Sequence, residues 1–571
     1  MKIKLIGINA RYSHSCLALF YLRNELEKHL PGVQTRICQY TINDPSFTLF
    51  QRIAEPGIDY FFFSALIWNS DLIEQVIEDL LAVDLSCHIV VGGPQAEVVG
   101  ARFADDERVS AFIGDIEAAG PQFYEDLAKS GLNKRYQASF FGVAPSSGPI
   151  RIGFPYRPED FSAQLKNRAI YYESSRGCPF FCTYCLSSSQ TGLYHKDLDQ
   201  VLAELEEILS HKPATVRFVD RTFNDIPARA LKIWEFIRDQ DPDTLFHFEI
   251  APDRFTPELF CFLESIRAGL FQFEIGIQST NPQTLEAIRR PIKPQPAARV
   301  IRQLRSLETI HLHADLILGL PYETADSFRV SLNDVFAMRP HYIQMGLLKL
   351  LPETEIRRQA RQYGFRARSR PPYTVLANRW LGPAELQELY WLGECLERCV
   401  NNRYFVSLWS YLDQAGEDMA RFFSALAKRF FEQGYFWKAV TQEILSRLLL
   451  EECSGREDFE LIRELICYDW LRCGHRFLPH HLCYAQPSID ELRRTLYGRL
   501  PEELTGVYDR KTRKVFLKKS VFHHFSTQAM RWVGHQIEDN IGTASTLVCF
   551  LSERESRVHR FNKVILLKNS D

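Results

Sequence analysis

Short apolar runs and amphipathic helical patterns alternate over residues 1–135. The apolar runs predict strands, and apolar positions that recur every three or four residues predict helices between them, such as Leu17–Leu30 and Asp71–Leu81. Strands alternating with helices indicate an open, doubly wound parallel sheet, which binds ligands beyond the carboxyl ends of its strands. The expected strands are Ile3–Ile8, Thr35–Cys38, Tyr60–Ala65, His88–Val91 and Val109–Ile113.

Residues 136–168 carry Gly142, Gly148 and Gly153 with little periodicity, which is typical of a linker. Six strand–helix units follow over residues 169–374. Six units are two short of a closed eight-fold barrel, and barrels of this kind carry their chemistry at the carboxyl ends of the strands. The expected strands are Ala169–Glu173, Val216–Asp220, Leu245–Ile250, Phe271–Gln278, Leu312–Leu318 and Tyr342–Lys349.

Long amphipathic stretches from residue 375 onward predict a mainly helical C-terminal domain over residues 375–571. Two β-like runs near its end are Lys514–Leu517 and Ser545–Leu551. Several cysteines in this domain could be imagined as a second cluster site, but a buried cysteine is more often a small apolar filler. These cysteines are Cys395, Cys399, Cys453, Cys467, Cys473 and Cys483.

Three cysteines on one short loop carry the most specific chemistry of the chain. Cys178, Cys182 and Cys185 have the spacing C-x3-C-x2-C, and Gly177 lets the backbone turn tightly before the first of them. Three thiolates can hold three irons of a 4Fe–4S cluster and leave the fourth iron open. The alternatives are a zinc site or three buried thiols, but zinc signatures come as two pairs of ligands.

Composition adds mainly exclusions. A formal charge of −3 gives no general attraction to nucleic acid or to an anionic membrane. No stretch approaches the roughly 18 apolar residues of a membrane span, and the first apolar run is too short for a signal peptide. Fourteen cysteines in 571 residues are not a disulfide framework, and a cluster loop favours a reducing compartment. We therefore expect a cytoplasmic protein.

The cysteine loop resembles that of the radical S-adenosylmethionine (SAM) superfamily, including the aromatic Tyr184 before the last cysteine. The resemblance implies an open six-fold barrel as the core and a SAM molecule bound to the open iron. It further implies that one electron from the cluster cleaves SAM to methionine and a 5′-deoxyadenosyl radical. A low-potential donor such as flavodoxin or ferredoxin would supply that electron.

The strand ends resemble those of the oxygen-independent coproporphyrinogen oxidase and its relatives. The resemblance assigns SAM binding to Glu249, Gln278, Arg290 and Asp315, and places Ile317 against the adenine. Asp and Gln can accept ribose hydroxyl protons, and Arg can pair with the methionine carboxylate. The alternative for each is a structural hydrogen bonder. Two further candidates, Asp220 and Asn224, stand where the family often has a Gly-Gly-Glu segment, although the two glycines are missing here.

Two segments of the N-terminal domain resemble cobalamin-binding domains. Ser64-Ala65-Leu66 matches their Ser-x-Leu element, and Gly92-Gly93 matches the glycine pair that lets the nucleotide tail pass, so Ser64, Leu66, Gly92 and Gly93 are candidate cobalamin contacts. The third element, Asp-x-His-x-x-Gly, is absent. Aligned on His14, the loop has Tyr12 and Leu17 at the Asp and Gly positions, so a loop histidine is favoured over a cobalt ligand.

The resemblance as a whole is to cobalamin-binding radical SAM enzymes of an uncharacterised subgroup with a helical extension. It implies methylation of an unactivated centre of a small molecule, with no nucleic acid or membrane partner. The alternatives are a cobalamin-assisted rearrangement or cyclisation, and a non-catalytic cobalamin or SAM sensor. A methylthiotransferase would need three further N-terminal ligands, for which only Cys16, Cys38 and Cys87 are available. Candidate substrate contacts at the barrel mouth are Arg221, Phe223 and Tyr322.

Overall fold

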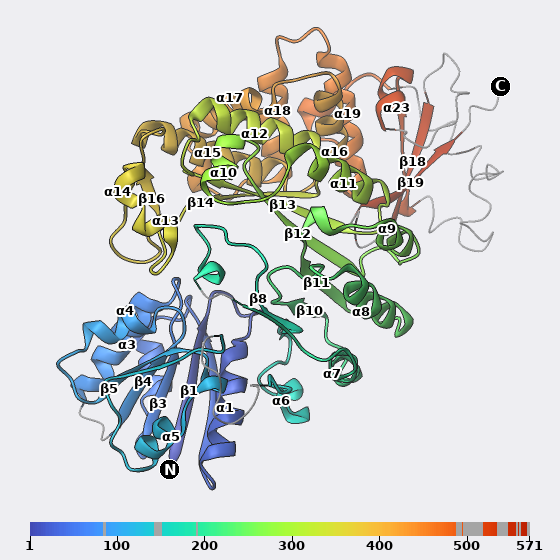
Figure 1. Cartoon of the computed structure of the whole chain (residues 1–571). Coiled ribbons are helices and arrows are strands. Elements are labelled where there is room, and N and C mark those ends of the chain that lie inside the picture. Colours follow the sequence, from blue (N-terminus) through green and yellow to red (C-terminus); the bar gives the residue numbers. More distant parts are fainter. Residues whose placement is uncertain are drawn as a thin grey trace.

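A parallel sheet covered by helices on both faces forms the N-terminal part of the computed structural model (Figure 1). The strand order is β2-β1-β3-β4-β5-β6. The chain adds β2 on one side of β1 and then adds β3 to β6 on the other side, so the topological switch point lies between β1 and β3. The strands are β1 (Lys2–Asn9), β2 (Gln34–Thr41), β3 (Tyr60–Ser64), β4 (His88–Gly92), β5 (Val109–Gly114) and β6 (Arg135–Ala138). The structure describes residues 1–83, 87–141, 151–189, 192–486, 494, 518–533, 546–554, 558 and 561–567.

Each face of this sheet has its own apolar core because the side chains of a strand alternate between the two faces. Ile3 and Leu5 pack with the helices of one face, and Ile6 and Ile8 pack with those of the other. Helices α1 (Leu17–His29) and α5 (Pro121–Ala128) cover the first face, and α2 (Ser46–Ile53), α3 (Ser70–Ala82) and α4 (Ala96–Arg102) cover the second. The predicted doubly wound sheet is confirmed, with β6 as a sixth strand.

The segment that follows β6 is attached to the N-terminal domain rather than hanging free. Its short helix α6 (Pro158–Ser162) carries Asp160, which accepts two hydrogen bonds from Arg23 of α1 at 2.6 and 2.8 Å. Both side chains are less than a tenth exposed, and a bidentate arginine–carboxylate pair fixes orientation as well as distance. Gly142 and Gly148 of the expected linker lie outside the described residues.

The middle of the chain is a six-stranded parallel β/α unit with the order β14-β13-β12-β11-β10-β7, which leaves β7 and β14 at its two edges. This confirms the predicted open six-fold barrel. Its strands are β7 (Ile170–Tyr172), β10 (Thr215–Phe218), β11 (Leu245–Glu249), β12 (Phe271–Gln278), β13 (His311–Leu318) and β14 (Tyr342–Leu347). Its helices are α7 (Leu198–Ser210), α8 (Pro227–Asp239), α9 (Pro257–Glu264), α10 (Pro282–Ala287), α11 (Pro294–Ser306) and α12 (Ala325–Ala337).

Alternation along the barrel strands separates an aromatic outer face from a polar inner face. Phe246, Phe248, Phe271 and Phe273 are fully buried, and the last three contact Trp234 of α8 between sheet and helices. The residues between these phenylalanines therefore face the inside of the barrel. Their side chains are the ones available to a ligand bound there.

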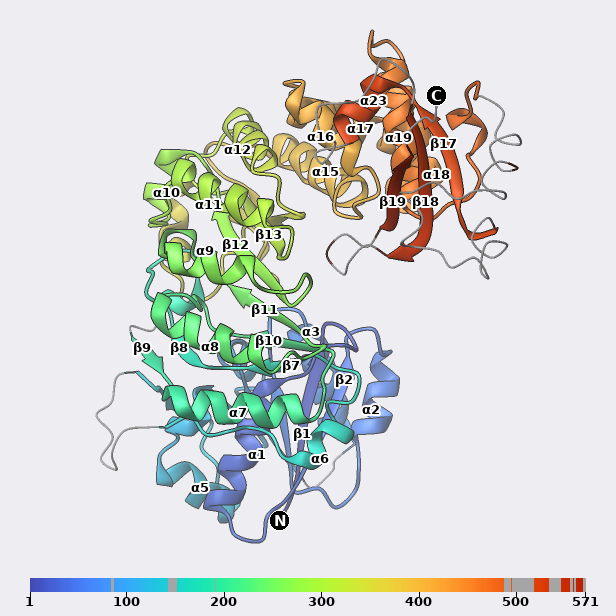
Figure 2. The same cartoon turned by 90° about the vertical axis from the view of Figure 1, so that its right-hand side faces the viewer.

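The C-terminal part packs against the side of the barrel away from the N-terminal domain (Figures 1 and 2). As predicted, it is mainly helical, with α15 lying against β14 and α17. Its elements are α15 (Pro383–Cys399), α16 (Val406–Gln414), α17 (Met419–Glu432), α18 (Gln442–Cys453), α19 (Phe459–Arg472), β17 (Val521–Phe525), α23 (Thr527–Val533), β18 (Thr546–Arg554) and β19 (Asn562–Leu567). A connecting segment of α13 (Glu355–Arg358), α14 (Ala360–Tyr363), β15 (Arg366–Ala367) and β16 (Val375–Ala377) joins it to the barrel.

The late β-like runs and the late cysteines have separate outcomes. The run Ser545–Leu551 overlaps β18, which pairs antiparallel with β17 and β19. Lys514–Leu517 lies outside the described residues. Cys395, Cys399, Cys453 and Cys467 are fully buried among apolar side chains, in keeping with small core fillers.

Candidate active site

The three cysteines lie between two short antiparallel strands, β8 (Ser175–Gly177) and β9 (Leu193–His195). Gly177 has φ +94°, and a Cβ there would lie 2.1 Å from the carbonyl oxygen of Gly192, so only glycine fits this turn. Two backbone hydrogen bonds anchor the loop to the barrel mouth. Thr183 donates to Ile288 after α10 at 3.0 Å and accepts from Ile356 of α13 at 2.9 Å.

Two polar side chains of the barrel lie beside the thiols of this loop, one from the segment after β10 and one from the segment after α10. Arg290 Nη1 lies 3.8 Å from Cys182 Sγ, and Thr222 Oγ1 lies 3.6 Å from Cys178 Sγ. Burial raises the pKa of the Cys178 thiol, and the charges of Cys185 and Cys182 raise it further. Burial, and then Cys182, likewise raise the pKa of Tyr184 well above its ordinary value. The Cys178 thiol thus lies within electrostatic range of the other two.

The ligands of a single metal ion lie closer together than the three thiolates of a cluster, in which each thiolate binds its own iron. Within the described ranges, no three His, Cys, Asp or Glu side chains converge closely enough to hold one ion. The donor set at the loop is three cysteines with a neighbouring guanidinium. This set suits a three-thiolate cluster with one open iron.

Three of the expected SAM residues have buried polar atoms without a partner. These atoms are Gln278 Oε1, Arg290 Nε and Asp315 Oδ1. A buried polar atom left without a hydrogen bond costs about 1–3 kcal/mol, so such atoms point to a missing ligand. Gly276 links them, because its carbonyl oxygen accepts from Arg290 Nη2 at 2.5 Å and a Cβ there would lie 2.2 Å from Gln278 Nε2. The inner face at this level therefore fits a polar ligand such as SAM.

Carboxyl groups on three adjacent strands lie beside these atoms. Burial raises the pKa of Glu249 to about 7, while Arg221, whose Nη1 lies 3.7 Å from Glu249 Oε1, opposes that rise. Burial raises the pKa of Asp315 well above its ordinary value, and the charges of Glu274 and Glu249 add to the rise. Ile317 follows on the same face of β13.

The side chains of Asp220 and Asn224 form hydrogen bonds with other residues of the protein. Asp220 accepts from the Ser174 amide and from the hydroxyls of Ser174 and Ser175, which lead into the cysteine loop. Asn224 exchanges two hydrogen bonds with the backbone of Ala251 at 2.8 and 2.9 Å. The structure gives both a structural role, and their contact with SAM stays a prediction.

Sequence reasoning missed four inward-facing polar residues of the barrel: Arg217, His247, Glu274 and His313. Glu274 Oε2 lies 3.0 Å from His247 Nε2, and this hydrogen bond leads the causes that lower the Glu274 pKa. The strict alternation Phe-Gln-Phe-Glu-Ile-Gly-Ile-Gln of β12 is the signal that could have found Glu274. Helices cover the outside of the barrel, so every second position of such a strand faces inward.

The substrate candidates divide into available and buried side chains. Phe223 is only 4% exposed and packs on Phe248 and Trp234, with ring centroids 4.3 and 5.7 Å away. It belongs to the core between sheet and helices, which corrects its expected place at the barrel mouth. The Arg221 side chain is 55% exposed and Tyr322 is 38% exposed, so both are available to a ligand.

The expected cobalamin residues lie together at the carboxyl edge of the N-terminal sheet. Ala65 donates to the carbonyl of Gly92 at 2.8 Å, which joins the loops after β3 and β4. Gly93 has φ +91°, and a Cβ there would lie 2.6 Å from the carbonyl oxygen of Ala65. A Cβ at Gly92 would meet only ordinary contacts at 3.9 and 4.0 Å, so packing alone does not require glycine there. Ser64 is buried, and Leu66 is half-buried.

The loop after β1 packs against the first barrel strand, β7. Ala169, just before β7, donates to the Ser13 carbonyl at 2.8 Å, and Arg168 Nη1 donates to the carbonyls of Tyr12 and His14 at 2.6 Å each. The His14 ring meets Tyr171 edge-on at 6.1 Å. Burial lowers the His14 pKa, so its imidazole is neutral.

Two family profiles match the chain. That of the Radical SAM superfamily matches residues 172–335, and that of a protein of unknown function (DUF4080) matches residues 361–549. No helix among the described residues is long and apolar enough to cross a membrane.

Curated relatives match about a third of the chain. The 2-(S-pantetheinyl)-carbapenam-3-carboxylate methyltransferase of Streptantibioticus cattleyicolor is 27% identical over 35% of this chain and 30% of its own. The cobalamin-dependent radical SAM methyltransferase TokK of Streptomyces tokunonensis is 26% identical over 34% of this chain and 30% of its own. An uncharacterized methyltransferase of Pyrococcus horikoshii is 26% identical over 32% of this chain and 40% of its own. The matched segment thus spans less than half of each relative.

Solved structures match over a larger share. The cobalamin-dependent SAM radical enzyme OxsB, with aqua-cobalamin and SAM bound, has a TM-score of 0.55 at 13% identity, over 93% of this chain and 83% of OxsB. The methyltransferase TsrM from Kitasatospora setae, with cobalamin and a 4Fe–4S cluster bound, has a TM-score of 0.50 at 15% identity, over 67% of this chain and 84% of TsrM. Residues 172–335 therefore match the radical SAM superfamily, and the chain shares its fold with the cobalamin-dependent radical SAM enzymes OxsB and TsrM.

Proposed function

We propose that this enzyme is a cobalamin-dependent radical SAM methyltransferase that acts on a small molecule. The observation that carries the proposal is the set of buried polar atoms without partners, on Gln278, Arg290 and Asp315, beside a loop of three cysteines. The N-terminal sheet supports the cobalamin part, because its Gly92 site is open although its fold does not need a glycine. Relatives named as methyltransferases support the reaction class.

Each side chain has a role in this proposal. Cys178, Cys182 and Cys185 would each hold one iron as thiolates, and Arg290 would pair with the carboxylate of SAM. Asp315 and Gln278 exchange hydrogen bonds with the ribose hydroxyls. When bound, the cluster supplies the electron that cleaves SAM, and cobalamin supplies a methyl carrier.

The N-terminal cysteines argue against the methylthiotransferase alternative. Cys16 follows β1 at the carboxyl edge of the sheet, Cys38 lies within β2, and Cys87 precedes β4 at the opposite edge. Thiols at opposite ends of parallel strands cannot ligate one cluster, so these three do not supply the second cluster of that class.

The test uses the full chain, loaded anaerobically with iron, sulfide and cobalamin and given SAM with a 13C-labelled methyl group. With reductant and an extract of small metabolites, we expect 5′-deoxyadenosine, S-adenosylhomocysteine and a product that carries the label. Omitting cobalamin should remove the labelled product but not all of the 5′-deoxyadenosine. Cobalamin-dependent change of a metabolite without label would replace methyl transfer by a rearrangement or cyclisation. Absence of cobalamin binding would overturn the proposal.

A further inference from the structure

The inside of the barrel below the SAM residues is lined by hydrogen-bonding side chains. Residues that pair across neighbouring strands form two rows of inward-facing side chains. The lower row crosses five strands. The upper row crosses four strands and lies two residues further along the strands that both rows cross, nearer the SAM residues. The lower row is Tyr171, Arg217, His247, Gln272 and His311. The upper row is Glu249, Glu274, His313 and Tyr342. Interiors of closed barrels are filled by branched apolar residues, so these rows are built to meet a polar molecule.

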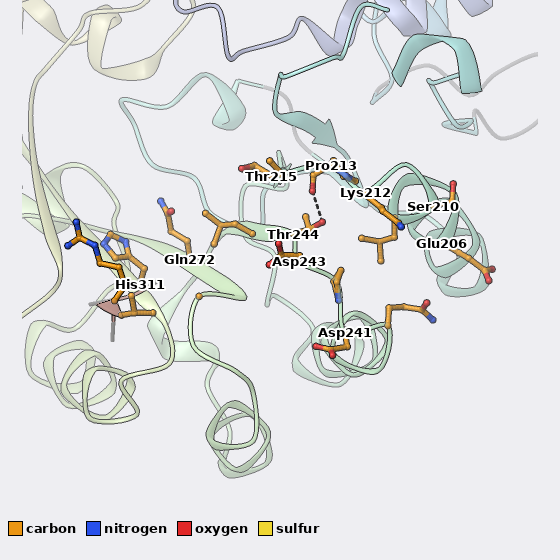
Figure 3. A pocket seen from close by; sticks show the side chains of 18 residues that line it. Glu206, Ser210, Lys212, Pro213, Thr215, Asp241, Asp243, Thr244, Gln272 and His311 are labelled. Carbon is orange, nitrogen blue, oxygen red and sulfur yellow. Dashed lines mark hydrogen bonds between the residues drawn. The ribbon is translucent and has the colours of Figure 1, made fainter. Parts of the chain in front are cut away.

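The same interior opens on a large pocket at the opposite end from the cysteines. Its volume is about 1490 Å³, and its wall includes four inward-facing positions near the amino ends of β10 to β13: Thr215, Leu245, Gln272 and His311. Figure 3 shows Gln272 and His311 on one side of this pocket and Glu206 and Ser210 on the other. Gln272 and His311 of the lower row therefore line this pocket, and Arg217 of the same row is only half-buried.

Arg217 is the cation of the lower row, and it forms no ion pair with any described residue. Its Nη2 lies 3.4 Å from His247 Nε2, but that nitrogen already lies 3.0 Å from Glu274 Oε2. An ionised carboxylate only accepts hydrogen bonds, so His247 Nε2 carries a proton and cannot accept from Arg217. The guanidinium therefore faces the interior without a hydrogen-bond acceptor from this pair.

A second guanidinium reaches the same region from the N-terminal domain. Arg11, on the loop after β1, also forms no ion pair with a described residue, and it lies near the Tyr342 phenol of β14. Arg217 and Arg11 both add to the lowering of the His14 pKa that burial begins. Both guanidiniums thus lie close enough to His14, whose ring meets Tyr171 of β7, to help lower its pKa. Unpaired arginines in a partly buried site favour an anion.

We propose that the substrate carries an anionic group, a carboxylate or a phosphate, that binds Arg217 inside the barrel below SAM. This inference rests on the proposed function, because it places the substrate in the same interior as the SAM residues. Arg217 then determines the class of substrate, and the histidines and Glu274 around it form hydrogen bonds with other polar groups of the substrate. The reacting carbon is held above, toward the SAM residues.

The test measures small anions on the holoenzyme by saturation-transfer NMR. The probes are acetate and methylphosphonate, which separate a carboxylate site from a phosphate site, with acetamide and dimethyl methylphosphonate as neutral counterparts. The proteins are the wild type, Arg217→Gln, Arg217→Lys and Lys232→Gln, which removes an exposed positive charge from α8 of the same unit. Losing charge-assisted hydrogen bonds of roughly 1.5–3 kcal/mol should weaken binding about tenfold or more.

We expect one anion to bind the wild type and Lys232→Gln, to bind Arg217→Lys more weakly, and to lose binding in Arg217→Gln, while neutral probes bind none of them. The cobalamin spectrum and SAM binding should stay unchanged in Arg217→Gln, which separates this result from a failure of the proposed function. Equal anion binding by wild type and Arg217→Gln, or none by the wild type, would overturn the inference.

Discussion

Asp315 is the carboxyl group of the candidate site that most needs a ligand as a hydrogen-bond partner. One carboxyl oxygen is buried without a partner, and burial, with the charges of Glu274 and Glu249, raises the pKa of the carboxyl group. Asp315→Ala removes the whole carboxyl group, and we expect SAM affinity to fall about tenfold or more for two lost hydrogen bonds. Equilibrium binding of SAM to the reconstituted protein measures this loss.

Asp315→Asn is the matched control, because an amide keeps one donor and one acceptor in the same shape. It should bind SAM better than the alanine variant does. Iron content should be equal in both variants. Unchanged SAM binding in Asp315→Ala would remove this residue from the site.

Gly92 and Gly93 differ in what they tolerate. The positive φ of Gly93 and its contact with Ala65 mean that Gly93→Ala should destabilise the N-terminal domain by about 1–3 kcal/mol. Gly92→Ala should fold normally, whereas Gly92→Trp should fold and lose cobalamin because the indole fills the open site. Thermal unfolding and the cobalamin absorbance of the purified variants measure the two effects separately. Cobalamin affinity that is unchanged in Gly92→Trp contradicts the assignment.

The residues of the candidate site were predictable to different degrees. The cysteine spacing and the strand-end residues Gln278 and Asp315 follow from sequence because each lies in a local pattern. Arg217 and His247 were missed because their importance comes from pairing between strands that are far apart in sequence. Asp220 was expected to meet SAM, but its two serine partners are visible only once β7 and β10 are paired.

At the scale of elements, one buried carboxyl joins two C-terminal helices. Asp469 of α19 accepts from the Ser407 amide and hydroxyl and from the Leu408 amide at the start of α16. Burial nevertheless raises its pKa from 3.8 to about 7. The folded state then holds a proton that the unfolded state releases between about pH 4 and 7, so stability falls as pH rises through this window.

Asp469→Asn should remove this pH dependence, because the amide reproduces the protonated acid. At 1.4 kcal/mol per unit of pKa, the variant should gain up to about 4 kcal/mol relative to the wild type between pH 4 and 7. Urea unfolding of the C-terminal part at several pH values measures this gain. Asp326→Asn, at a fully exposed carboxylate, is the control. Parallel pH profiles for wild type and Asp469→Asn contradict the account.

The strands themselves were largely predictable, and the exception has a physical reason. The six barrel strands and five of the N-terminal strands fall where apolar runs predict them. Strand β6 reads Arg-Tyr-Gln-Ala, is half exposed and has one neighbour, β5. An edge strand buries little, so its sequence need not be apolar, and its pairing with β5 decides its conformation.

At the scale of the whole molecule, a buried ion network holds the N-terminal domain against the cysteine loop. Arg176, two residues before Cys178, pairs with Asp115 and Glu117 of the N-terminal domain and with Glu173 of its own chain segment. On the far side, Tyr373 donates to Gln95 at 2.7 Å. Such contacts between distant segments are invisible in the sequence. They set the open carboxyl edge of the N-terminal sheet toward the barrel.

The central claim is that the three-cysteine loop builds a cluster whose open iron cleaves SAM. The most direct measurement is the 5′-deoxyadenosine formed by the reduced, reconstituted full chain, compared with Cys178→Ala, Cys182→Ala and Cys185→Ala. Cys261→Ala, at an exposed cysteine of α9, is the control. The account predicts 5′-deoxyadenosine from the wild type and the control and none from the three variants. Equal amounts from the wild type and any of the three, or none from a wild type that holds its full complement of iron, would contradict it.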